Sequence, residues 1–344
     1  MNSLLIIATP LVACVICAML IVLLRPQLQR YALARPNARS SHSVPTPQGG
    51  GVAVIAAVIT SVAISVSFFG AVAGSVLLAV LAAAVLLALV GAYDDLRTIP
   101  VLPRLLIQAA AVGIVLATLP AEFHLVQVLP VWAERVLLLI SGLWFVNLVN
   151  FMDGLDWITA AEVVPVMAAL ALFGFYGQLP LGPTLVALAL CGAMIGFAPF
   201  NKPVAKLFLG DVGSLPIGLL MGWCLLQLAG SGHLIAALLL PLYYLADATL
   251  TLLKRLMRGE TVWVAHRSHF YQQATNNGFS VMQVVGEVFI LNIVLAAFAA
   301  VTIWQKSPYV QGIALALGIS AVALVLGRFS RKRDPLGGSK PPRS

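Results

Sequence analysis

Residues 73–92 read AGSVLLAVLAAAVLLALVGA, an uncharged run that is followed after Tyr93 by Asp94 and Asp95. A helix of about 20 apolar residues spans the roughly 30 Å hydrocarbon core of a bilayer, so this run predicts a transmembrane helix that ends on two carboxylates. Ten more apolar runs of similar length follow the same pattern: 4–24, 51–69, 104–120, 133–150, 158–175, 183–199, 213–229, 233–253, 282–304 and 309–327. No alternation typical of barrel strands is visible. The sequence therefore predicts an all-α polytopic membrane bundle of eleven transmembrane helices.

Composition supports a membrane protein. The chain is 61% hydrophobic and 9% charged, whereas soluble domains carry roughly 25% charged residues. Lys and Arg outnumber Asp and Glu by 20 to 12, but they are scattered through short loops without interleaved aromatic residues, which argues against nucleic acid as a partner. The four cysteines lie in apolar runs, and Cys14-x-x-Cys17 lacks the context of a redox or zinc site.

The distribution of basic residues predicts the orientation. With the N-terminus in the periplasm, eighteen of the 20 Lys and Arg residues fall on the cytoplasmic side, and only Arg135 and Lys306 fall outside. This bias follows the positive-inside rule. The first run is too long for a signal peptide and is expected to be retained. We expect one transmembrane domain over 1–329 and a disordered basic cytoplasmic tail over 330–344.

Five of the seven aspartates lie at the ends of apolar runs that open on the predicted cytoplasmic side: Asp94, Asp95, Asp153, Asp156 and Asp211. A carboxylate near the hydrocarbon costs several kcal/mol unless it is paired or metal-bound. Their convergence predicts a divalent metal and a phosphorylated substrate. For Asp94 and Asp95 the alternative is a solvated helix end paired with Arg97. Adjacent side chains on a helix point about 100° apart, so one carboxylate would bind metal while the other faces a substrate or a cation.

Three other polar patterns accompany these carboxylates. Asn147, Asn150, Asp153 and Asp156 recur every third residue and follow one polar face, which is a binding surface or a structural stripe. Asp211 and Ser214 precede an apolar run, where they cap a helix or prepare its N-terminus for a phosphate. Upstream of them, one segment supplies an amide, two cations and a stacking ring: Asn201, Lys202, Lys206 and Phe208.

The longest internal cytoplasmic loop contains His266, Arg267 and His269. Their imidazoles and guanidinium group offer donors for a pyrophosphate, although a basic loop held to anionic lipid is the alternative. Asp247, within the run 233–253, is expected to make a polar contact inside the bundle. The glycines of PTPQGGG (45–51) permit close backbone approach, and the absence of a Walker pattern argues against a nucleoside triphosphatase.

Five strings occur in a fixed order between residues 39 and 275: PTPQGGG, YDDL, NLVNFMDGLD, FNKPVAKLFLGDVGSL and the His-containing HRSH. Together they resemble the polyprenyl-phosphate N-acetylhexosamine-1-phosphate transferase family, glycosyltransferase family 4. The resemblance implies a multi-pass enzyme of the bacterial inner membrane with its active site on the cytoplasmic face. It implies Mg²⁺ as cofactor, with Mn²⁺ as a substitute, and UDP-N-acetylhexosamine, undecaprenyl phosphate and the lipid bilayer as partners.

In this reaction a lipid-linked phosphate attacks the β-phosphorus of the UDP-sugar and releases UMP. The resemblance implies that Asp211 is the main magnesium ligand, with Asp94 and Asp95 near the metal and the phosphates. It places His266 and His269 at the pyrophosphate, beside Arg267, and Phe208 against the uracil. Substrate-binding residues are then expected to include Asn147, Asn150, Asp153, Asp156, Asn201 and Lys206.

The string HRSH departs from the three histidines common in the family, because Arg267 and Ser268 occupy two of the usual positions. This departure favours the branch that initiates O-antigen and lipopolysaccharide assembly over the muramoyl-pentapeptide enzymes. The sugar stays open among N-acetylfucosamine, N-acetylquinovosamine and N-acetylglucosamine, and a homodimer is left open. The alternative function is a divalent-cation or organic-anion transporter, which would place its polar groups near the bilayer midplane rather than at helix ends on one face.

Overall fold

The computed structural model describes residues 3–34, 45–69, 74–261 and 266–333. Within these ranges the regular secondary structure is helical apart from one short antiparallel pair, in which β1 (Leu33–Ala34) pairs with β2 (Thr46–Pro47). Residues 334–344 of the predicted tail lie outside the described residues.

The all-α prediction is confirmed, and each predicted apolar run coincides with helical structure. The helices are α1 (Ser3–Tyr31), α2 (Gly51–Phe69), α3 (Ser75–Leu96), α4 (Val101–Ala117), α5 (Val131–Met152), α6 (Ile158–Phe175), α7 (Leu181–Phe197), η1 (Ala198–Phe200), α8 (Asp211–Gly230), α9 (Leu234–Leu239), α10 (Leu242–Met257), α11 (Phe270–Asn276), α12 (Val281–Trp304) and α13 (Pro308–Phe329). In the described part of the chain, nine of them are long and apolar enough to cross a membrane. The protein is therefore a polytopic membrane bundle, while eleven crossings and a periplasmic N-terminus stay predictions.

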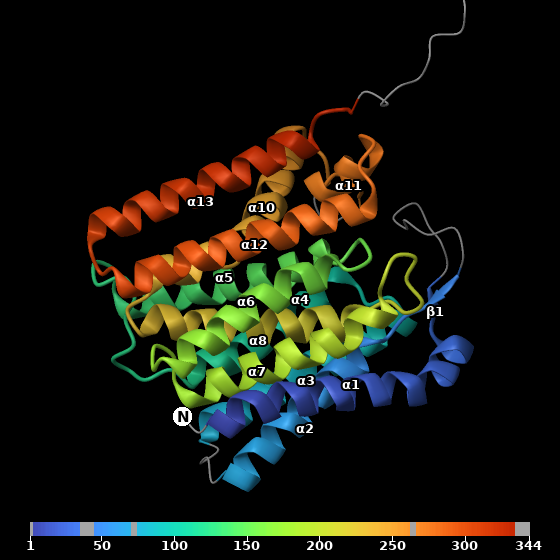
Figure 1. Cartoon of the computed structure of the whole chain (residues 1–344), viewed down its shortest axis with the longest axis horizontal. Coiled ribbons are helices and arrows are strands. Elements are labelled where there is room, and N and C mark those ends of the chain that lie inside the picture. The colour runs from blue at the N-terminus through green and yellow to red at the C-terminus, as the bar shows by residue number, and fades with distance from the viewer. Residues whose placement is uncertain (1–2, 35–44, 70–73, 262–265, 334–344) are drawn as a thin grey trace, which may run out of the picture.

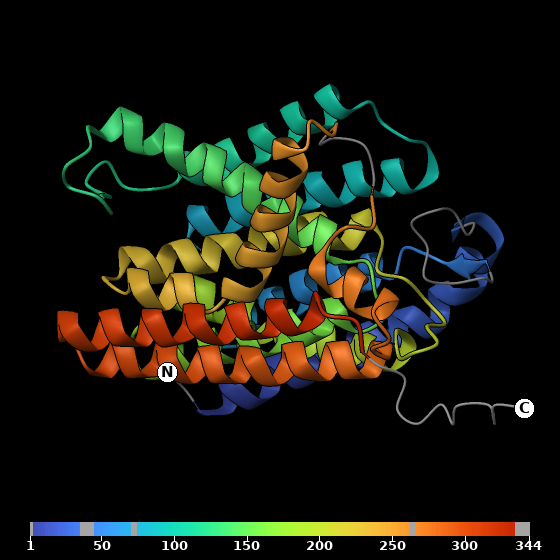
Figure 2. The same cartoon turned by 90° about the horizontal axis from the view of Figure 1, so that it is seen from above.

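One predicted span differs from the structure. Residues 233–253 form two helices, the short α9 and the longer α10, with Pro241 between them. Proline has no backbone N–H to continue a helix and is tolerated at a helix start, so the chain changes direction there. Figure 2 shows α10 running across the bundle rather than along it.

The bundle has two distinct ends. Helix α1 begins towards one end of the long axis, and α13 finishes towards the other, near α11 (Figure 1). Helix α8 lies between α2, α3 and α5 and is mostly buried.

Glycines allow the first turns of α8 to approach two neighbours closely. Gly51 of α2 lies against the backbone of Gly213, and Gly91 of α3 lies against the backbone of Asp211. Small residues at helix contacts let backbones meet in a bilayer, where association depends on close packing. These contacts fix where α8 begins.

Replacing Gly91 with alanine should destabilise the fold, because the added Cβ would overlap the backbone of Asp211. Overpacking of this kind costs about 1–3 kcal/mol, and thermal unfolding in detergent measures it. Gly286→Ala in α12 is the matched control, since a Cβ there meets nothing within 4 Å. Equal melting temperatures for the two variants would contradict the close packing of α3 on α8.

Candidate active site

The end of α3 is fastened to the start of α8 by Asp95. Its Oδ1 accepts a hydrogen bond from the backbone N–H of Asp211 at 3.0 Å, and its Oδ2 accepts one from Val212 at 3.2 Å. The first N–H groups of a helix have no partner within the helix. A carboxylate at this position also interacts favourably with the positive end of the helix dipole. Asp95 therefore caps α8 from a different helix.

Gly210 makes room for this cap. Its φ is +77°, a conformation that side chains rarely adopt, and a Cβ there would lie 2.5 Å from Oδ2 of Asp95. The GDVGS string is thus a tight turn into α8 that only glycine accommodates at this position.

Asp94 points to a different partner. Its Oδ1 accepts a hydrogen bond from the backbone N–H of Ile99 at 2.6 Å, and its Oδ2 accepts one from Nη1 of Arg104 at 2.7 Å. The same Nη1 lies 3.9 Å from Oδ2 of Asp211. The guanidinium of Arg104 therefore stands between two carboxylates and partly neutralises both. Arg97, which the sequence offered as a partner of the two aspartates, was the wrong arginine for Asp94.

Asp211 has a side chain that faces partly outward. Its side chain is 28% exposed, against 7% for Asp94. Oδ1 of Asp211 accepts a hydrogen bond from Nδ2 of Asn150 at 2.7 Å, and the same amide lies 2.8 Å from Oγ of Ser214. Asn150, from the last turn of α5, thus orients Asp211.

Asp153 follows α5 and is half-buried beside these groups. Its Oδ1 accepts the hydroxyl of Thr159 at 2.5 Å. The pKa of Asp153 is raised to about 7, mainly by burial; the Thr159 hydrogen bond opposes the shift, and the negative charges of Asp211 and Asp156 contribute to it. Several carboxylates therefore converge at the start of α8, with Arg104 offsetting part of their charge.

Asp156 and Asn201 are buried and shape the loop that precedes α8. Oδ2 of Asp156 accepts the backbone N–H of Ala205 at 3.0 Å, and Oδ1 of Asn201 accepts that of Trp157 at 2.7 Å. Nδ2 of Asn201 also donates to the carbonyl of Leu207 at 3.0 Å. The contacts shown for these two predicted substrate-binding residues support the loop.

The loop presents Lys206 and Phe208 near the 45–51 stretch. Lys206 is exposed and Phe208 is half-buried. The backbone of Phe208 donates to the carbonyl of Pro47 and accepts from Gly50, both at 2.9 Å. The glycines of PTPQGGG therefore bring this stretch against the loop, as their permissive geometry predicts.

Asn147 does not join the cluster through its hydrogen bonds. It is buried, and its Nδ2 donates to Oε1 of Gln108 at 2.7 Å and to the carbonyl of Leu143 at 2.8 Å. These contacts link α4 to α5, so the polar face predicted to start at Asn147 is divided between helix packing and the site.

The His266–His269 segment lies at the same end of the bundle. The rings of His266 and His269 are 4.9 Å apart between centroids, and Arg267 is half-buried between them in sequence. The hydroxyl of Tyr271, in α11, donates to the carbonyl of Phe151 at 3.0 Å. The histidines are thus tied to the end of α5 that carries Asn150.

Asp247 was expected to make an interior polar contact, and this is confirmed: its side chain is fully buried. That contact reaches His269, which the sequence did not indicate. The polar residues Tyr243, Asp247 and Thr251 recur every fourth position of α10, and this stripe could have been recognised.

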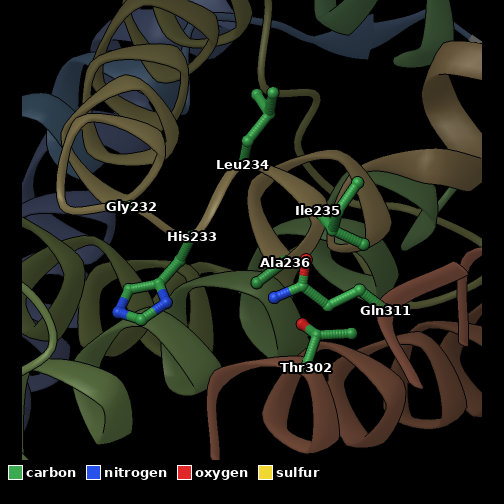
Figure 3. A pocket seen from close by; sticks show the side chains of 7 residues that line it. All are labelled: Gly232, His233, Leu234, Ile235, Ala236, Thr302 and Gln311. Carbon is green, nitrogen blue, oxygen red and sulfur yellow. The ribbon is translucent and has the colours of Figure 1, made fainter. Parts of the chain in front are cut away.

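A pocket of about 270 Å³ lies elsewhere, at the far end of α8 (Figure 3). It is lined by Gly232, His233, Leu234, Ile235, Ala236, Thr302 and Gln311. None of the predicted site residues contributes to it.

In the described part of the chain, no group of three or more His, Cys, Asp or Glu side chains is arranged as a ready-made metal site. Mg²⁺, however, is usually bound by one or two carboxylates together with water and substrate phosphates. The outward-facing carboxylate of Asp211 fits that donor chemistry. Asp95 and Asp94 engage their oxygens with N–H groups and Arg104, so the metal role predicted for all three stays a prediction.

Comparison with known proteins agrees with this geometry. Residues 77–229 match the model of glycosyl transferase family 4, and this interval contains the carboxylate cluster. The chain is a membrane protein of the polyprenyl-phosphate sugar-phosphate transferase class, and it belongs to glycosyl transferase family 4.

Three relatives illustrate the similarity. The chain is 26% identical over 353 residues to the decaprenyl-phosphate N-acetylglucosaminephosphotransferase of Mycolicibacterium smegmatis, covering 90% of this chain and 84% of that protein. It is 26% identical to a probable undecaprenyl-phosphate N-acetylglucosaminyl 1-phosphate transferase of Bacillus subtilis, covering 94% of each. A phospho-N-acetylmuramoyl-pentapeptide-transferase of Neisseria gonorrhoeae is 43% identical over 90 residues, 22% of this chain and 25% of that protein.

The raised pKa of Asp153 gives a test of the crowded carboxylates. A carboxyl whose pKa is raised to about 7 by folding stabilises the folded state while it is protonated, below its ordinary pKa near 4, and loses that contribution as the pH rises through about 7. Asn cannot titrate. In metal-free buffer, the melting temperature of wild type relative to Asp153→Asn should therefore fall between pH 5 and pH 8, and a difference that stays constant over this range would contradict the assignment.

Proposed function

We propose that this protein transfers an N-acetylhexosamine 1-phosphate from a UDP-sugar to a polyprenyl phosphate, undecaprenyl phosphate in particular. An oxygen of the lipid phosphate forms a bond to the β-phosphorus, the bond between that phosphorus and the bridging oxygen breaks, and UMP leaves. The observation that carries the proposal is the outward-facing Asp211 carboxylate at the capped start of α8, flanked by Asp94, Asp95 and Asp153.

The residues of the site suit the chemistry of phosphoryl transfer. Phosphoryl transfer depends mainly on positioning and on charge stabilisation. The acceptor phosphate monoester has a second pKa near 6 and is largely dianionic at neutral pH, so no side chain needs to remove a proton from it. The names of the relatives, which specify polyprenyl-phosphate acceptors and N-acetylglucosamine, support the same reaction.

Different residues of the chain would take different roles in this reaction. Asn150 orients Asp211, and Arg104 limits the repulsion between Asp211 and Asp94. Lys206, Arg267 and the two histidines offer donors to the diphosphate. Mg²⁺ held by Asp211 would neutralise phosphate charge and supply Lewis-acid assistance.

The remaining particulars extend the proposal. We place the protein in the bacterial inner membrane with its site on the cytoplasmic face, because most basic residues lie in the loops at that end. The product would enter O-antigen or a related cell-surface polysaccharide. The sugar is N-acetylfucosamine, N-acetylquinovosamine or N-acetylglucosamine, and the relatives' names favour the last.

UMP release by purified protein tests the function. Undecaprenyl phosphate, Mg²⁺ and each UDP-N-acetylhexosamine are supplied in turn, with omission of lipid or metal as controls. Release that needs both lipid and metal is expected. Folded protein that releases no UMP, yet carries divalent cations or organic anions into proteoliposomes, would favour the transporter alternative instead.

Asp211→Asn should reduce kcat by at least about 100-fold, because the amide keeps the shape but loses the charge that a divalent cation requires. Glu287→Gln is the control: Glu287 in α12 is 25% exposed, close to the 28% of Asp211, and pairs with Arg328. Turnover of that control should match wild type. Near-normal turnover by folded Asp211→Asn would remove Asp211 from the reaction.

A further inference from the structure

Asp247 makes an unusually complete set of contacts for a buried carboxylate. Its Oδ1 accepts the backbone N–H of Phe270 at 3.0 Å and lies 3.2 Å from Nδ1 of His269. Its Oδ2 accepts the backbone N–H of Tyr271 at 3.1 Å. The hydroxyls of Thr251 and Tyr243, one helical turn away on either side, complete the set at 3.3 and 3.2 Å.

These contacts fix the ring of His269. An ionised carboxylate only accepts hydrogen bonds, so Nδ1 of His269 must carry a proton to bond Asp247. In the neutral imidazole Nε2 is then the nitrogen with the lone pair, and in the imidazolium it is the second donor. The ring is 3% exposed and stacks on Tyr271 at 5.6 Å between centroids, which restricts its rotation.

The same contacts connect α10 to the carboxylate cluster. Asp247 holds Tyr271 by its backbone, and the Tyr271 hydroxyl donates to the carbonyl of Phe151. Phe151 is the neighbour of Asn150, which orients Asp211. Lys254 adds a second attachment, with its Nζ 4.1 Å from the centroid of the Phe270 ring.

We propose that Asp247 is a positioning residue for the transfer reaction, one that acts through His269. It selects the tautomer of His269, holds its ring still and docks residues 266–271 against the end of α5. The inference rests on the proposed function, in which His269 meets the diphosphate. Asp247 itself is fully buried inside the bundle and touches no substrate.

The chain contains a second buried carboxylate with a similar set of neighbours, which serves as a control. Oε1 of Glu134 accepts the backbone N–H groups of Leu125 and Val126 at 2.6 and 3.0 Å, and Oε2 lies 2.9 Å from Nδ1 of His124. Glu134 is in the first turn of α5, whereas Asn150 is in its last. The motif of a buried carboxylate, a histidine and two consecutive N–H groups therefore occurs at both ends of α5, but only one copy adjoins the carboxylate cluster.

Asp247→Asn tests the proposal. The amide can still accept from Phe270, but its NH₂ group then faces the N–H of Tyr271, so the segment loosens. We expect kcat for UMP release to fall about 10- to 100-fold, by analogy with the loss seen when a group that orients a metal-ligating histidine is removed, with little change in KM for the UDP-sugar. Glu134→Gln should leave both constants near wild type.

A double-variant cycle separates positioning from general destabilisation. If Asp247 acts through His269, Asp247→Asn should add little further loss in a His269→Ala background. Two results would overturn the proposal. One is a double variant whose loss of kcat equals the product of the two single-variant losses, and the other is an Asp247→Asn enzyme that keeps wild-type kcat. Should Asp247→Asn fail to fold, Tyr271→Phe takes its place: losing the bond to Phe151 should lower kcat about 2- to 10-fold, and an unchanged kcat would overturn it.

Hydrogen exchange gives a readout that does not depend on turnover. Amide protection of residues 269–277 should drop in Asp247→Asn and stay unchanged in Glu134→Gln. If Asp247→Asn loses protection but the wild type releases no UMP, the contact between Asp247 and the 269–271 segment is supported and the proposed function is contradicted. Unchanged protection in Asp247→Asn would overturn the contact itself.

Discussion

The hydrogen bonds from the first two N–H groups of α8 to Asp95 decide where the whole candidate site lies. Those donors would otherwise be left without partners at the edge of a membrane. With Asp95 supplying the cap from α3, Asp211 is not needed for that purpose, and its side chain can face outward. The close contact of Gly91 with the backbone of Asp211 is what lets α3 come near enough to provide the cap.

Negative charge around this cap exceeds positive charge, and this imbalance is what the proposed chemistry would use. Arg104 bridges Asp94 and Asp211, but the half-buried Asp153 lies close enough to share their negative field. A divalent cation would relieve such crowding and would at the same time attract a diphosphate. The histidines lie at the same end of the bundle because Tyr271 fastens α11 to the end of α5. Segments distant in sequence thus meet at one end of the bundle.

Much of the fold was predictable, because the length and apolarity of a membrane-spanning helix are local properties of the sequence. The division of 233–253 at Pro241 was missed, since four other prolines lie inside helices that continue through them. The aspartates of the site were recognised, but not their individual roles. Whether Asp95 caps α8 or Asp156 holds a loop depends on which backbone N–H lies opposite, and only the tertiary structure fixes that.

Anomalous scattering from Mn²⁺ in crystals grown with UDP-N-acetylglucosamine tests most directly whether the start of α8 is one joint site for metal and nucleotide-sugar. The predicted result is a peak at coordination distance from Asp211, with the diphosphate density between this carboxylate and the His266–His269 segment. A peak inside the bundle, or in the pocket between Gly232 and Gln311, with nucleotide bound away from Asp211, would contradict the assignment.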